Sequence, residues 1–119
     1  MSLADDLSKA ASDALTAGVN AARGEGVALA ADFQKLLEPN LLDIVRRIAD
    51  ITAARIAGTI STELAQLDLK PQFESIEDLA EAEAELVLLA VQNILNAVIN
   101  ALKAVINTAT THALGFALV

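Results

Sequence analysis

The sequence predicts an all-α fold: an elongated protomer of three helices, or four if the first helix is kinked, packed as a bundle or coiled coil and expected to be oligomeric. Three observations predict this class. Hydrophobic residues make up 55% of the 119 residues and aromatic residues only 3%, so the core must consist of aliphatic side chains, as in helical bundles. Apolar residues recur at helical spacing, and only two prolines divide the chain. We expect one domain, residues 1–119, because a chain of this length buries roughly two thirds of its unfolded surface.

The two prolines are expected to separate the helices. Pro39 and Pro71 each lack a backbone donor and disfavour helical geometry in the residue before them. Asn40 and Ser75, shortly after the prolines, are residue types that cap helix N-termini. We therefore expect helices over residues 3–38, 41–67 and 76–112, followed by a short apolar tail over residues 113–119.

The first expected helix contains Gly24-Glu25-Gly26. Two glycines lower the stability of a helix by roughly 2 kcal/mol relative to alanine. The apolar phase nevertheless continues across residues 24–26, so a kink is favoured, and a break into two helices remains open. The expected middle helix is amphipathic, with Val45, Ile48 and Ile56 on one face.

Charge excludes one class of partner. The chain is acidic, with a net charge of −8, and eight acidic residues lie between positions 63 and 85 whereas none follows position 85. A phosphate backbone would be repelled, and the chain has neither Trp nor Tyr for base stacking, so we expect no nucleic-acid partner. The absence of cysteine removes disulfides, thiolate nucleophiles and cysteine metal sites.

Between residues 91 and 107 the polar residues of the third expected helix follow a narrow stripe. At about 100° per residue, about 100° of arc holds all of them: Gln92, Asn93, Asn96, Asn100, Lys103 and Asn107. The remaining arc of about 260° is aliphatic, which exceeds what two neighbouring helices can cover. We therefore expect the chain to associate with itself through an interface formed by Val87, Val91, Ile94, Leu95, Val98, Ile99, Leu102, Val105 and Ile106. An additional contact with another protein, through this C-terminal helix or through the tail, is left open.

Two interpretations of the asparagine row remain open. Asn93, Asn96, Asn100 and Asn107 can form a solvated stripe on the outside of the assembly. Alternatively, one or two of these amides lie across the interface and set its register, as single polar residues do in coiled coils.

A membrane span is the first alternative for the same helix. Residues 86–106 contain 16 apolar residues among 21, close to the length that crosses a bilayer. Five polar residues, the lack of an aromatic belt and the lack of flanking basic clusters argue against membrane insertion. The first twenty residues contain three Asp and no continuous apolar stretch, so we expect no signal peptide and a location in the cytoplasm or in an assembled particle.

The residues that could carry chemistry are few. The acidic face of Glu74, Glu77, Asp78, Glu81 and Glu85 lacks the Glu-x-x-His pairs of dinuclear bundle sites, and a solvated face is the simpler interpretation. His112 is the sole histidine and has no carboxylate near it in sequence. We expect no catalytic, cofactor or metal site.

These observations favour a non-enzymatic, self-associating structural protein, scaffold or adaptor. Small helical proteins of this kind occur among viral, phage and bacterial assembly components, which is an association with a class and not a deduction from these residues. The alternatives are a membrane-active protein that inserts residues 86–106, and a carrier that binds an apolar ligand in its aliphatic core.

Overall fold

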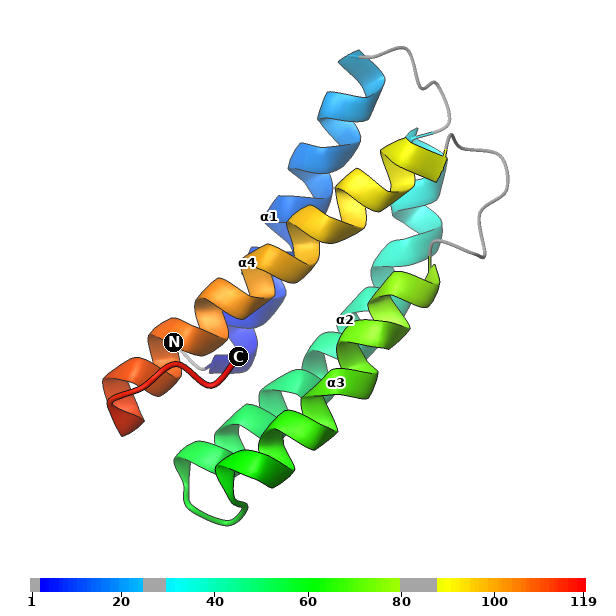
Figure 1. Cartoon of the computed structure of the whole chain (residues 1–119). Helices are drawn as coiled ribbons and strands as arrows, with labels where there is room; N and C mark the ends of the chain where they lie inside the picture. Colours follow the sequence, from blue (N-terminus) through cyan, green and yellow to red (C-terminus); the bar gives the residue numbers. More distant parts are fainter. Residues whose placement is uncertain (1–2, 25–29, 80–87) are drawn as a thin grey trace.

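The computed structural model describes residues 3–24, 30–79 and 88–119, and this part of the chain is all-α, as predicted. Its overall extents are 46 × 24 × 20 Å, so the molecule is elongated. Figure 1 shows α4 alongside α1, with α2 and α3 side by side next to them. α1 packs closely against α4 and α2, α2 packs against α3, and α3 and α4 make fewer contacts with each other. The four helices are α1 (Leu3–Gly24), α2 (Ala30–Ile56), α3 (Thr62–Asp78) and α4 (Leu88–Leu114).

The helix boundaries differ from the expected ones at both prolines. Pro39 lies inside α2 and Pro71 inside α3, so Asn40 and Ser75 are helical residues and not N-caps. Both proline rings are exposed, whereas the residues two positions away from each ring are buried, among them Leu37 and Leu41 around Pro39. Burial of these flanking side chains offsets the roughly 3 kcal/mol by which an interior proline destabilises a helix.

The turn between α2 and α3 falls inside the range expected for the middle helix. Gly58 has φ +79°, which favours glycine; its N–H donates to the Arg55 oxygen at 3.1 Å, and the Thr59 N–H donates to the Ala54 oxygen at 3.0 Å. This pair of hydrogen bonds is a Schellman motif, which ends α2. Ser61 then caps α3, because its side chain accepts a hydrogen bond from the Leu64 N–H at 3.1 Å.

The first and third expected helices are also changed. Residues 3–38 are divided between α1, which ends at Gly24, and α2, which begins at Ala30. Two helices therefore replace the single kinked one, although residues 25 and 26 of the expected kink lie outside the described residues. α4 begins at Leu88 and not at residue 76, and it extends to Leu114.

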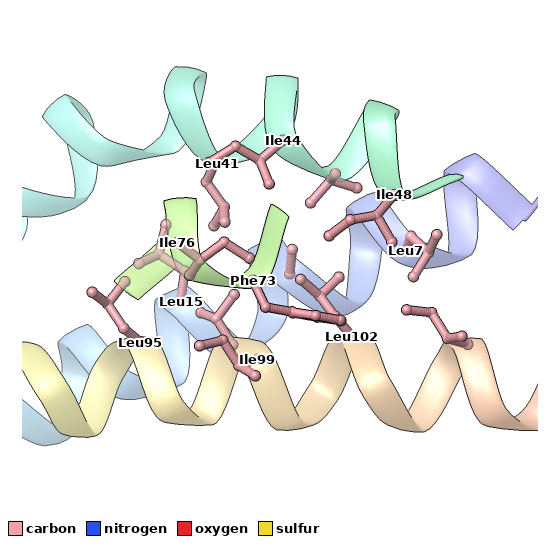
Figure 2. Close-up of a cluster of buried hydrophobic side chains, with 14 of the residues drawn as sticks. Leu7, Leu15, Leu41, Ile44, Ile48, Phe73, Ile76, Leu95, Ile99 and Leu102 are labelled. Atoms are coloured by element: carbon pink, nitrogen blue, oxygen red, sulfur yellow. The ribbon is translucent and has the colours of Figure 1, made fainter. Parts of the chain in front are cut away.

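All four helices contribute to one aliphatic core. Figure 2 shows Leu7 and Leu15 of α1, Leu41, Ile44 and Ile48 of α2, Phe73 and Ile76 of α3, and Leu95, Ile99 and Leu102 of α4 around a shared interior. α1 and α4 approach each other closely at Gly18: a Cβ added there would lie 3.1 Å from Ile94 Cγ1 and 3.2 Å from Ile94 Cα. A glycine at this position therefore lets the two helices pack closely.

Candidate functional site

The aliphatic face of α4 lies inside the chain's own core. Six of the residues expected at an interface between chains are at most 6% exposed: Ile94, Leu95, Val98, Ile99, Leu102 and Ile106. Val105 is partly buried against the same core. Val87 lies outside the described residues, and the side chain of Val91 is not described. Because the described residues form four helices, three helices are available to cover α4 where we had expected two.

The asparagine row faces outward over most of its length. Asn93, Asn96 and Asn100 are exposed, as in the solvated interpretation of the stripe. Asn107 differs, because it is only partly exposed and its amide binds the backbone of Val119. The four asparagines therefore do not have equivalent environments.

Residues 113 and 114 of the expected tail belong to α4, which extends to Leu114. Residues 115–119, which we call the tail from here on, fold back along α4 (Figure 1). Asn107 Nδ2 donates to the backbone oxygen of Val119 at 2.9 Å, and the Val119 N–H donates to Asn107 Oδ1 at 2.9 Å. The Leu118 N–H donates to Thr110 Oγ1 at 3.2 Å, and Gln66 Nε2 of α3 donates to the Leu118 oxygen at 2.9 Å. The backbone of the tail is thus held by three polar side chains from two helices.

The side chains of the tail have different environments. Leu118 is only 1% exposed and belongs to the core, whereas Phe116 and Val119 are 42% and 40% exposed. Gly115, with φ +85°, ends α4 and starts the reversal of the chain. Through Leu118, the tail therefore docks onto the bundle of its own chain.

A groove of about 460 Å³ runs along the docked tail and is open to solvent. Its walls come from α3, α4 and the tail: Gln66, Leu69, Lys70, Phe73, Glu74, Glu77, Lys103, Leu118 and Val119. Lys103 Nζ lies 5.3 Å from the centroid of the Phe73 ring, within the range of a cation–π interaction. The groove therefore combines aliphatic and aromatic surface with two lysines and two glutamates, which balance in charge.

Two further exposed apolar side chains lie on α3. Leu64 is 43% exposed and Leu67 is 67% exposed. Together with Phe116 and Val119 they are the large apolar side chains that remain well exposed in the described part of the chain. All four therefore belong to α3 or to the tail, and none belongs to α4.

A second open groove, of about 430 Å³, lies between the start of α1 and the end of α4. Asp6, Thr108 and His112 are among its lining residues, so the fold brings a carboxylate towards the histidine that the sequence left without one. Within the described ranges, no group of three or more His, Cys, Asp or Glu side chains is placed to hold a metal ion. Of the expected acidic face, Glu74, Glu77 and Asp78 lie at the end of α3, and Glu81 and Glu85 lie outside the described residues.

Membrane insertion was the main alternative for α4. Among the residues that the structure describes, none of the helices combines the length and the apolar character that a bilayer crossing requires. The expected range 86–106 begins outside the described part of the chain.

Sequence reasoning did not identify the side chains that hold the tail, which are Gln66, Asn107 and Thr110. A docked tail was itself predictable, because a glycine followed by apolar residues, here Gly115 and Leu118, predicts a helix end and a docked segment. Gln66 gave no such signal, since it lies 52 residues from Leu118 in the chain.

Comparisons of this chain with protein-family models, with curated proteins and with solved structures find no match.

Proposed function

We propose that this chain is a non-enzymatic, self-associating scaffold or adaptor whose contact surface is formed by α3 and the tail. The observation that carries the proposal is that the large apolar side chains that remain well exposed in the described part of the chain all belong to α3 or to the tail. Leu67 alone leaves two thirds of its side chain in water at 67% exposure. Burying such side chains against a partner contributes roughly 25 cal/mol per Å² of apolar surface.

The proposal places self-association on a surface different from the one inferred from the sequence. Ile94, Val98 and Leu102 are taken up by the core of their own chain, so they are not free for contacts with another copy. Leu64, Leu67, Phe116 and Val119 are free to make such contacts in a folded protomer. Contact through folded protomers is how most soluble homo-oligomers assemble.

The test is the molar mass of the purified full chain, measured by light scattering after size exclusion in buffer without detergent, over a range of protein concentrations. We expect a multiple of the 12.4 kDa chain mass. Leu67→Ser should shift the mass towards a single chain, because it removes the most exposed large apolar side chain without disturbing the core.

Asn96→Ser is the matched control, because Asn96 is exposed on α4, belongs to neither α3 nor the tail, and is not among the residues that line the groove. It should leave the mass unchanged. If Asn96→Ser dissociated the assembly and Leu67→Ser did not, the interface would lie on the asparagine row of α4. A mass of 12.4 kDa for the parent chain at every concentration would exclude self-association.

A further inference from the structure

We propose that the surface of α3 and α4 on which the tail docks is a binding site for an extended aliphatic segment, and that the tail of a second copy of this chain occupies it in the assembled state. The inference rests on the self-association proposed above. It adds the mechanism: two protomers exchange tails, so that each tail docks on its partner beside the groove.

The contacts of the tail define what the site recognises. Gln66 and Thr110 bind the oxygen and the N–H of Leu118, and Asn107 binds both backbone groups of Val119. All four hydrogen bonds are made to main-chain groups of the tail, so the site recognises the backbone of an extended segment. One side chain, Leu118, is inserted to 1% exposure. The occupant is therefore an extended segment with one aliphatic anchor, which a second copy supplies identically.

The geometry of the connection favours exchange. Three residues, 115–117, join the end of α4 to the buried Leu118. Gly115 is at φ +85°, and its N–H donates to the Thr111 oxygen at 3.0 Å, so the chain reverses immediately after the helix. A short connection of this kind acts as a hinge, because a change at one glycine redirects the whole tail, and short hinge connections favour domain swapping.

The folded-back arrangement leaves apolar surface uncovered. The contacts of the docked tail are the same whether the tail belongs to the chain itself or to its partner, so they cannot by themselves favour the assembly. Phe116 and Val119, however, remain 42% and 40% exposed when the tail folds onto its own chain. A second protomer drawn close by an exchanged tail can cover these side chains, and this added burial is the difference between the two arrangements.

The distribution of charge permits this approach of two acidic chains. Each copy carries a net charge of −8, yet residues 86–119 contain no acidic residue. The tail has no charged side chain, and Lys70 and Lys103 balance Glu74 and Glu77 around the groove. Two copies that meet at the end of α4 and the tail therefore avoid the like-charge repulsion that other faces would create.

Isotope-filtered NMR on the unmodified full chain tests the exchange directly. Protein with 13C-labelled leucine methyls and unlabelled protein are mixed in equal amounts, unfolded and refolded together. The filtered spectrum reports contacts between the labelled methyls of one chain and protons of the other. We expect a contact between the Leu118 methyls and the ring of Phe73, which line the same groove.

The spectrum contains its own control. Leu102 and Phe73 both contribute to the core of one protomer (Figure 2), so contacts from the Leu102 methyls to the Phe73 ring should be absent from the filtered spectrum. A multiple of 12.4 kDa with the Leu118 contact present supports tail exchange. A multiple with that contact absent overturns exchange and leaves self-association standing. A mass of 12.4 kDa overturns both.

Discussion

Gly18 shows how a single side chain position controls the distance between two helices. We expect Gly18→Ala to lower the free energy of unfolding, because the new methyl would lie 3.1 to 3.3 Å from three atoms of Ile94, one of them the backbone Cα. Overpacking of this kind costs about 1–3 kcal/mol, more than the roughly 0.5–1 kcal/mol that alanine gains over glycine inside a helix. Urea denaturation of the variant measures the change.

Gly24→Ala is the control for this substitution. Gly24 is also helical, at the end of α1, and a Cβ added there would meet no atom within 4 Å. Its free energy of unfolding should be unchanged or slightly higher. If both variants became more stable, α1 and α4 would be packed less closely at Gly18 than the structure shows.

Thr110 differs from the other fully buried threonine in what its hydroxyl accepts. Both Thr52 and Thr110 are 0% exposed and donate to the carbonyl four residues earlier, but Thr110 Oγ1 also accepts the Leu118 N–H. We expect Thr110→Val to lower the free energy of unfolding by about 1–3 kcal/mol, because a buried N–H loses its partner. Amide hydrogen exchange at Leu118 should accelerate at the same time.

Thr52→Val is the matched control, since it removes a buried hydroxyl whose only described bond is to its own helix. A change of at most about 0.5 kcal/mol is expected. Equal losses in the two variants would mean that the Leu118 N–H contributes nothing to the effect, and that the tail is held chiefly by its side chain.

At the scale of the element, the two prolines explain why the predicted boundaries moved. Proline disfavours a helix interior, and this local preference was applied to Pro39 and Pro71 alike. Each ring is exposed, and buried residues on both sides of it keep the helix continuous. The turn at Gly58 and Ser61 could have been read from the sequence, because a glycine followed three residues later by serine provides both a helix stop and an N-cap. The low helix propensity of proline was a valid local signal, but burial of the flanking side chains outweighed it.

This explanation predicts that Pro71→Ala stabilises the chain. Alanine would restore the N–H that proline lacks, which can then donate to the Leu67 oxygen one turn earlier in α3. The free energy of unfolding should rise by roughly 1–3 kcal/mol. Urea denaturation again provides the measurement, and helical content from circular dichroism should be unchanged. A loss of stability would show that the local geometry imposed by Pro71 is needed where α3 meets the tail.

At the scale of the whole molecule, the width of the aliphatic face of α4 was predictable and its partner was not. The alternation of Asn93, Asn96 and Asn100 with Ile94, Val98 and Ile99 correctly separates exposed from buried residues. Which chain covers the buried side depends on the number of helices, and that number changed when α2 and α3 formed in place of one long middle helix. The groove could not be predicted either, because it requires Gln66, Lys103 and the tail to meet in three dimensions.

If this face belongs to the core of one chain, the effect of a substitution in it on the free energy of unfolding should not depend on protein concentration. Ile99→Ala should lower the free energy of unfolding by about 2–5 kcal/mol, because Ile99 is 6% exposed among side chains of its own protomer. Asn100→Ala, its exposed neighbour on the same helix, should change it by about 0.5 kcal/mol or less. Urea denaturation at low and high protein concentrations distinguishes the two locations of Ile99. If the contacts of Ile99 lie within one chain, the decrease in the free energy of unfolding caused by Ile99→Ala should not depend on protein concentration. If they lay between chains, this decrease would depend on protein concentration through mass action.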